Sequence, residues 1–230
     1  MLFRSGNKKS SVRKLILTAS GGPFRKYSKA KLQNVSLEDT LIHPTWNMGK
    51  KITVDSATMM NKGFEVIEAR WLFDIPAEKI DVAVHPESIV HSMVEYNDGA
   101  VMAQLGVPDM RLPIAYALNY PERLPQNLEP LNLTEVGKLT FEEADRQTFE
   151  CLQLAYDALE AGGACCTALN AANEVCVAAF LAGRIPFLSI QETLKKLTEK
   201  YASHPADTIE EILKADSSAR TDTADFLYRD

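Results

Sequence analysis

Hydrophobic and polar positions along the first half of the chain alternate in short runs that predict β-strands. Apolar runs bounded by turn residues predict strands at residues 15–18 and 79–86 and a pair of strands within 88–106. The triplet Asn-Asp-Gly at 97–99 separates the two strands of that pair. Because Asp-Gly supplies the positive φ angles of a tight turn, we expect a β-hairpin here.

Two amphipathic segments in the same half predict helices. The spacing of Phe64, Ile67 and Trp71 predicts a helix that begins near Ser56 and presents these three side chains to the core. Residues 110–120 predict a second helix, which ends before the next proline.

From about residue 146 onward the spacing of apolar positions is helical. Thr148 is the predicted N-cap of a first helix that ends at two glycines, and residues 167–183 form a second helix. Ser189 and Glu192 have the spacing of a capping box for a third helix. Pro205 interrupts this pattern, and one or two short helices are expected after it.

The predicted fold is therefore α/β, with a small mixed sheet in an α+β-like catalytic domain, followed by a C-terminal α-helical bundle. Three prolines within ten residues indicate a linker between the two regions, with a short edge strand near its end. The expected divisions are an unassigned segment 1–13, a catalytic domain 14–120, a Pro-rich linker 121–145 and a helical domain 146–230.

Composition and charge narrow the functional classes. The chain has 230 residues, 46% hydrophobic and 24% charged, with a formal net charge of −6. A net negative charge argues against a nucleic-acid partner, and no apolar run is long enough to span a bilayer. The cysteines show no Cys-x-x-Cys spacing, which predicts small buried side chains in a reducing compartment and a cytoplasmic protein: Cys151, Cys165, Cys166 and Cys176.

The N-terminal segment allows two interpretations. Residues 1–31 are rich in Lys and Arg and contain no acidic residue, which is typical of a transit peptide. However, the same stretch contains the predicted core strand at 15–18, which a cleavable peptide would not carry. We therefore expect a folded chain from about Lys14, and the first ten residues need not be native sequence.

The segment "VDSATMMNKGFE", residues 54–65, concentrates polar side chains beyond what a helix start needs. Ser56, Asn61 and Lys62 combine hydroxyl, amide and ammonium donors, which suit a phosphate group near a helix N-terminus. Glu65 either pairs with Lys62 or is a carboxylate ligand of a hard divalent cation. The residues alone leave both possibilities open.

Two further segments are candidates for a binding site. "TASGGPFR", residues 18–25, is either a structural turn or an anion-binding loop to which Ser20 adds a hydroxyl. "HPTWNMG", residues 43–49, places Trp46 either as an anchor of the loop or as a lid that excludes water from a ligand.

The histidines show no zinc-ligand spacing. His85 and His91 border the predicted hairpin and belong either to the core or to a pocket. His204 precedes a proline and is expected to be exposed.

Long ordered motifs make the chain resemble 1-deoxy-D-xylulose 5-phosphate reductoisomerase. They are "LTASGGPFR", "HPTWNMGKKITVDSATMMNKGFEVIEARWLF", "HPESIVHSMVEYNDGAVMAQLGVPDMRLPIAYAL" and "TALNAANEVCVAAFLAGRIPF". The resemblance implies conversion of that phosphosugar to 2-C-methyl-D-erythritol 4-phosphate in the non-mevalonate isoprenoid pathway. It also implies NADPH, a divalent cation such as Mg²⁺, Mn²⁺ or Co²⁺, and a homodimer. The implied reaction is a retro-aldol and aldol rearrangement followed by hydride transfer.

The same resemblance implies roles for individual residues. A substrate-binding role, chiefly toward the phosphate, falls on Ser20, His43, Ser56, Asn61, Lys62 and Glu65. Glu65 is also the implied metal ligand, whereas His43, Trp46 and His91 are the implied catalytic residues. The implied contacts to the nicotinamide cofactor are Met48, Gly49 and Met110.

The chain also departs from the family pattern. It has neither the GxGxxG dinucleotide fingerprint nor the Asp-Ser-Glu motif that supplies two further metal ligands. We therefore expect it to correspond to the catalytic and C-terminal regions of such an enzyme and to be inactive by itself. The alternatives are a non-catalytic phosphosugar-binding module, or a related oxidoreductase that acts on another phosphosugar with its nucleotide domain supplied in trans.

Overall fold

The computed structural model describes residues 9–202 and 204–228, and it contains a five-stranded mixed sheet in the order β4-β3-β1-β2-β5. The central strand β1 pairs parallel with β2 and antiparallel with β3, and both outer strands are antiparallel to their neighbours. The strands are β1 (Val12–Ala19), β2 (Ile80–Val84), β3 (Val90–Tyr96), β4 (Val101–Leu105) and β5 (Glu142–Glu143).

The sequence predicted this sheet well. The two strands at 15–18 and 79–86 are confirmed as β1 and β2, and the hairpin is confirmed as β3 and β4. Gly99 in its turn has φ +86°, a conformation that glycine adopts without strain. The edge strand expected near the end of the linker is present as β5.

Among the helices that precede the bundle, α4 has the most extensive contacts with the sheet. The helix α4 packs against β1 and β2, and a left-handed Met59 separates it from the preceding helix α3. The helices that precede the bundle are η2 (Lys9–Ser11), α1 (Lys29–Leu32), α2 (Leu37–Thr40), α3 (Lys50–Ala57), α4 (Met60–Phe73), η3 (Ala77–Lys79), α5 (Arg111–Asn119) and α6 (Leu133–Val136).

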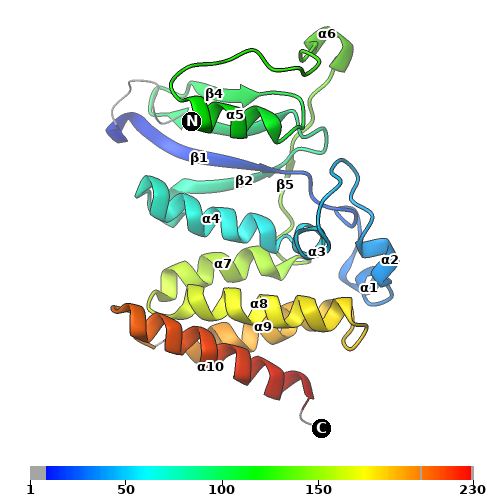
Figure 1. The fold of residues 1–230 in the computed structure, drawn as a ribbon, viewed down its shortest axis with the longest axis vertical. Coiled ribbons are helices and arrows are strands. Elements are labelled where there is room, and N and C mark those ends of the chain that lie inside the picture. Colours follow the sequence, from blue (N-terminus) through cyan, green and yellow to red (C-terminus); the bar gives the residue numbers. More distant parts are fainter. Residues whose placement is uncertain (1–8, 203, 229–230) are drawn as a thin grey trace.

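The helices of the second half form the expected bundle. Figure 1 shows successive layers: the sheet, then α4, then α7, and then the remaining three helices of the bundle. Small side chains permit close contact between the layers, since Ala155 of α7 faces Gly63 of α4. The bounds are α7 (Glu150–Ala161), α8 (Cys165–Leu181), α9 (Phe187–Tyr201) and α10 (Ile209–Tyr228).

The prediction of one helix from Ser56 to residue 73 was wrong. The segment forms two helices, and Ser56 lies in the last turn of α3. The backbone of Met59 is left-handed, with φ 64° and ψ 7°, so the chain changes direction there between α3 and α4. A left-handed backbone is uncommon for a residue with a side chain, so helical periodicity does not reveal this break.

The predicted inward stripe of α4 was also wrong at its last residue. Trp71 is 69% exposed, while Phe64 and Ile67 are partly buried. The face that is buried instead carries Met60, Lys62, Gly63, Val66 and Ala69. The reason is that α4 lies between the sheet and α7, where close packing favours small residues over an indole.

Three details of the helical bundle differ from expectation. The N-cap of α7 is Phe149 rather than Thr148. The capping box at Ser189 is absent, because α9 already begins at Phe187, directly after Pro186. The one or two short helices expected after Pro205 are the single 20-residue helix α10.

The unassigned segment 1–13 lies partly outside the described residues. Residues 9–13 form η2 and the start of β1, so the fold begins slightly before Lys14. The division into two domains and a linker stays a prediction. All four cysteines are free, and three of them are buried. Within the described residues, no helix is both long and apolar enough to cross a membrane.

Candidate functional site

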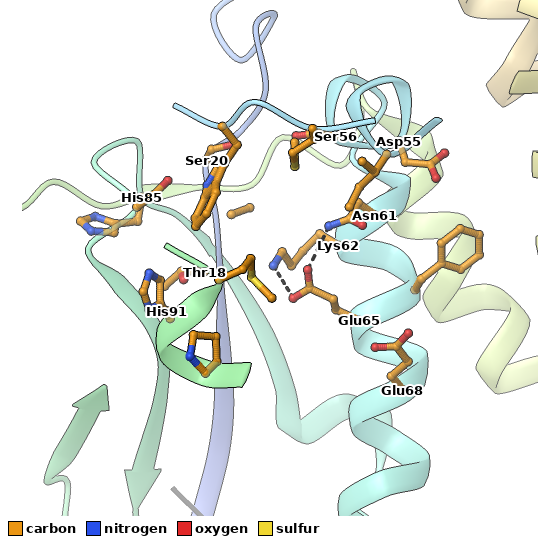
Figure 2. A pocket seen from close by; sticks show the side chains of 18 of the residues that line it. Thr18, Ser20, Asp55, Ser56, Asn61, Lys62, Glu65, Glu68, His85 and His91 are labelled. Carbon is orange, nitrogen blue, oxygen red and sulfur yellow. Dashed lines mark hydrogen bonds and ion pairs between the residues drawn. The ribbon is translucent and has the colours of Figure 1, made fainter. Parts of the chain in front are cut away.

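A large pocket of about 1460 Å³ lies beside the C-terminal end of β1. Its walls come from the loop after β1, the loop 43–49, α3, α4, the β3–β4 hairpin and α5. Figure 2 shows that side chains from these separate segments converge on one space. The lining includes ten of the predicted site residues: Ser20, His43, Trp46, Met48, Ser56, Asn61, Lys62, Glu65, His91 and Met110.

His43 connects the two serines of the pocket. Its Nε2 lies 3.0 Å from Oγ of Ser20 and 3.1 Å from Oγ of Ser56. Its Nδ1 accepts hydrogen bonds from the backbone N–H groups of Thr45 and Trp46, at 3.1 and 2.8 Å. Because Nδ1 is an acceptor, the proton of the neutral ring is on Nε2, which donates toward the hydroxyls. Burial lowers the pKa of His43, which favours this neutral form.

Gly22 shows why the turn after β1 requires a glycine at this position. A Cβ atom at Gly22 would lie 2.7 Å from the backbone oxygen of Ser56, and its φ is +65°. The backbone N–H of Gly22 also donates to Oγ of Ser20 at 3.3 Å. This close approach gives the turn a structural reason and brings Ser20 near Ser56, while the anion-binding interpretation stays a prediction.

Glu65 contacts both cationic and amide groups of the first turns of α4. Its Oε1 accepts a hydrogen bond of 3.0 Å from Asn61, and its Oε2 forms an ion pair with Lys62 (Figure 2). Lys62 is only 8% exposed, which is unusual for a lysine. The pairing of Glu65 with Lys62 is thus present, and the same carboxylate lines the pocket.

Among the described residues, no group of three or more His, Cys, Asp or Glu side chains could hold a metal ion. Glu65 offers one carboxylate to such an ion, and Glu68 follows one turn later on the same helix. Burial raises the pKa of Glu68, and the charge of Glu65 adds to this increase. The donor set fits one side of a divalent-cation site but does not complete it.

The three remaining histidines differ in environment. His85 is fully buried, with Nδ1 2.7 Å from the carbonyl oxygen of Thr140, and its Nε2 accepts from Ile89 N–H at 3.2 Å. His91 is partly buried and faces Gln104. His204 is exposed, as expected.

The predicted cofactor contacts are only partly brought together. Met48 and Met110 line the pocket, and Met110 is 58% exposed at the start of α5. Gly49 is not among the lining residues and is instead the N-cap of α3. Trp46 is half-buried and lines the pocket, so it has a position compatible with either an anchor or a lid.

Sequence reasoning missed several pocket residues: Lys51, Glu68, Gln104, Tyr116 and Arg123. The position of Glu68 could have indicated a pocket residue, since it lies three residues after Glu65 on the same helix. The position of Gln104 was a weaker indication, because it lies on the strand paired with that of His91. Tyr116 and Arg123 depend on the position of α5, which periodicity does not give.

Family models match both ends of the chain. The model of the 1-deoxy-D-xylulose 5-phosphate reductoisomerase C-terminal domain matches residues 1–73, and that of the DXP reductoisomerase C-terminal domain matches residues 105–222. The chain belongs to the DXP reductoisomerase family. The resemblance carried by the sequence motifs is thereby confirmed.

Curated relatives of the DXP reductoisomerase family match almost the whole chain. The 1-deoxy-D-xylulose 5-phosphate reductoisomerase of Trichlorobacter lovleyi is 56% identical over 97% of this chain and 58% of its own length. That of Chlorobium phaeobacteroides is 58% identical over 94% of this chain and 56% of its own. The chain therefore spans somewhat more than half the length of these relatives.

Solved structures of the DXP reductoisomerase family share the fold. The Zymomonas mobilis enzyme in complex with NADPH has a TM-score of 0.89 and 44% identity, covering 96% of this chain and 57% of that one. A DOX-P reductoisomerase in complex with NADPH, fosmidomycin and magnesium has the same TM-score and identity, covering 94% and 55%. The predicted fold class is confirmed.

Proposed function

We propose that the pocket binds 1-deoxy-D-xylulose 5-phosphate and that the chain takes part in its NADPH-dependent conversion to 2-C-methyl-D-erythritol 4-phosphate. One observation carries this proposal: His43 holds Ser20 and Ser56 together, in the pocket that Asn61 and Lys62 also line. Family membership supports it, because the relatives bear the name of this reaction.

The phosphate end of the substrate is assigned to these donors. Lys62 supplies a full positive charge from a largely buried position, and Asn61 supplies an amide N–H. Both lie in the first turn of the 14-residue helix α4, whose N-terminus attracts anions. Ser20, Ser56 and the Nε2–H of His43 complete a set of donors suited to phosphate oxygens.

The sugar end is assigned to the region of Glu65 and His91. Glu65 would contribute a carboxylate to a divalent cation, which supplies Lewis-acid polarisation of the substrate oxygens when bound. His91 offers a ring nitrogen to a sugar hydroxyl. NADPH, when bound, would supply hydride-transfer chemistry at this end of the pocket. Met48 and Met110 are assigned to the nicotinamide, and Gly49 acts only through the start of α3.

The loop 43–49 is assigned as the cover of the pocket. His43 fixes its start through four contacts, and Trp46 follows three residues later. A half-buried indole over a phosphosugar excludes water and thereby strengthens the polar contacts beneath it. This role requires the loop to move when substrate enters.

The assembly and location of the protein are further proposals. A homodimer is supported by β4, an edge strand on which Val101 and Met102 are 52% and 45% exposed. Light scattering of the purified chain tests this state, and a monomer at all concentrations contradicts it.

A cytoplasmic location is supported by the four free cysteines.

Calorimetric titration of the chain with 1-deoxy-D-xylulose 5-phosphate tests the substrate assignment. We expect this compound to bind more tightly than 1-deoxy-D-xylulose, which lacks the phosphate, and more tightly than inorganic phosphate, which lacks the sugar. Equal binding of D-ribose 5-phosphate would favour a general phosphosugar-binding module. Absence of binding would contradict the proposal.

A further inference from the structure

The side chains of Gln104 and His91 are hydrogen-bonded to each other across the β3–β4 hairpin. Oε1 of Gln104 lies 3.1 Å from Nδ1 of His91, and both side chains line the pocket. The pairing register of the hairpin shifts between Val90 and Ser92, directly at His91. Such a bulge turns a side chain away from its regular direction, which brings the His91 ring toward Gln104.

The orientation of the Gln104 amide is fixed by a second contact. Its Nε2 donates a hydrogen bond of 2.9 Å to the backbone oxygen of Leu105. The amide oxygen is therefore the atom that faces His91, and an oxygen only accepts. Nδ1 of His91 must carry a proton to complete this contact, so in the neutral ring Nε2 has the lone pair.

The Nε2 atom of His91 is buried and has no hydrogen-bond partner among the described residues. A buried acceptor without a partner is costly, and such an atom in a pocket wall is suited to a ligand donor. His43 has the opposite arrangement, since its Nδ1 accepts and its Nε2 donates. The two pocket histidines thus present a donor and an acceptor, respectively.

We propose that Gln104 is a positioning residue, which holds His91 in the Nδ1–H tautomer so that Nε2 accepts a hydrogen bond from a substrate hydroxyl. The second part rests on the proposed function, because the hydroxyl belongs to the phosphosugar. His91 would thereby distinguish a sugar hydroxyl, which can donate a hydrogen bond to Nε2, from a carbonyl or ionised phosphate oxygen, which cannot.

The surrounding packing is consistent with a fixed pair. A Cβ atom at Gly106 would lie 3.0 Å from Cδ2 of Leu112 and 3.4 Å from Nε2 of Gln104. The absence of a side chain at Gly106 therefore leaves room for Gln104 to reach Leu105 and His91 at once. A larger residue here would press on Leu112 first and then on the Gln104 amide.

Long-range ¹H–¹⁵N correlation of histidine-labelled protein tests the tautomer directly, in the 230-residue chain without substrate. We expect His91 to be protonated at Nδ1 and His43 at Nε2, with the His91 signals assigned by their loss in His91→Asn. Gln104→Leu should move the His91 proton to Nε2, the form that free imidazole side chains prefer. Gln104→Glu retains an acceptor oxygen and should keep the proton on Nδ1.

The controls separate this proposal from a structural role and from the proposed function. Gln126→Leu makes the same change at an exposed position and should leave both tautomers unchanged. Wild-type His91 protonated at Nε2 would overturn the proposal, even if Gln104→Leu fails to fold. A wild-type chain with the expected tautomer but no affinity for 1-deoxy-D-xylulose 5-phosphate would contradict the proposed function alone.

A binding measurement completes the test. Gln104→Leu should weaken binding of 1-deoxy-D-xylulose 5-phosphate about tenfold, because one hydrogen bond is lost. Its affinity for inorganic phosphate should stay unchanged, since the phosphate donors lie on other elements. Equal weakening for both compounds would mean that Gln104 supports only the fold of the pocket.

Discussion

The side-chain amide of Asn173 donates a hydrogen bond of 2.8 Å to Oδ1 of Asp55, and both residues are buried. The two are separated by 118 positions in the sequence. Their contact joins α8 of the helical bundle to α3, where Asp55 directly precedes Ser56 of the pocket. Lys51 pairs with the other carboxylate oxygen at 2.7 Å. The helical bundle therefore holds in place the helix that carries Ser56, one of the proposed phosphate donors.

Replacing Asp55 with Asn should change how stability depends on pH. Burial raises the pKa of Asp55 above its ordinary value of 3.8, although Asn173 and Lys51 oppose this shift. Between pH 3.8 and the raised pKa, the folded chain binds more protons than the unfolded chain. The free energy of unfolding therefore falls as the pH rises through this interval. Asp55→Asn has no carboxyl group to ionise, so its stability does not fall in this way. The difference in unfolding free energy between the variant and wild type should therefore shift in favour of the variant as the pH rises from about 4 to 7.

Urea unfolding of both proteins across this pH range measures the effect. Asp98→Asn makes the same change at an exposed position in the hairpin turn and serves as the control. A difference between wild type and Asp55→Asn that is constant with pH would contradict the prediction.

Local patterns predicted the sheet because each strand is encoded by a few consecutive residues. The turn at 97–99 specified the hairpin, and the motif 54–65 contains most of the proposed phosphate donors within twelve positions. The relationships that complete the pocket are not local. The contact of Asp55 with Asn173 crosses more than half the chain, so no spacing rule reveals it.

Backbone breaks were the second source of error. The left-handed Met59 divides one apparent helix into α3 and α4, and it places Ser56 and Asn61 on different helices. The register shift beside His91 similarly breaks the two-residue period of β3, which hides its pairing with Gln104. In both cases tertiary contacts override the local period.

Replacement by alanine should destabilise the fold to different extents at two glycines that have similar backbone conformations. Gly22 and Gly99 have φ of +65° and +86°, but only Gly22 lies against the backbone of Ser56. Gly99→Ala should cost about 1–3 kcal/mol of backbone strain. Gly22→Ala should cost about 1–3 kcal/mol more, because the added methyl group overpacks the contact.

Chemical denaturation gives both values, and a phosphate titration adds an independent readout. Gly22→Ala should also weaken phosphate binding, since it displaces Ser20 from Ser56. Equal stability and equal phosphate affinity in the two variants would show that the close approach at Gly22 has no energetic effect.

Lys62 should dominate binding at the phosphate end. Hydrogen bonds to a charged group contribute roughly 1.5–3 kcal/mol each, while association and ordering cost about 4–15 kcal/mol. Affinity for a phosphosugar should thus be weak, on the order of millimolar at best. Lys62→Ala removes the charge that Asn61, Ser20 and Ser56 cannot replace, and should abolish measurable binding. Ser20→Ala should weaken it only a few-fold.

Chemical shifts followed during titration with 1-deoxy-D-xylulose 5-phosphate measure these affinities. Lys79→Ala removes an exposed lysine away from the pocket and should bind like wild type. If Lys62→Ala binds as well as this control, the phosphate assignment is wrong.

Glu65 should link cation binding to phosphate binding, because its carboxylate contacts both of the proposed phosphate donors of α4. In the structure Oε1 accepts from Asn61 and Oε2 pairs with Lys62. A divalent cation prefers several oxygen ligands, and the described residues supply no cluster of three ionisable ligands. We therefore expect weak Mn²⁺ binding to the chain alone, and no NADPH oxidation when substrate and Mn²⁺ are added.

Glu65→Gln should separate the two effects. The amide loses the negative charge, so Mn²⁺ binding should disappear, while Lys62 becomes free and phosphate affinity should increase several-fold without metal. Glu78→Gln removes an exposed carboxylate and should change neither affinity. Calorimetry with Mn²⁺ and with inorganic phosphate gives both quantities. A tight Mn²⁺ site in wild type that Glu65→Gln abolishes would mean that further ligands exist in the chain, and unchanged phosphate affinity would mean that Glu65 does not restrain Lys62.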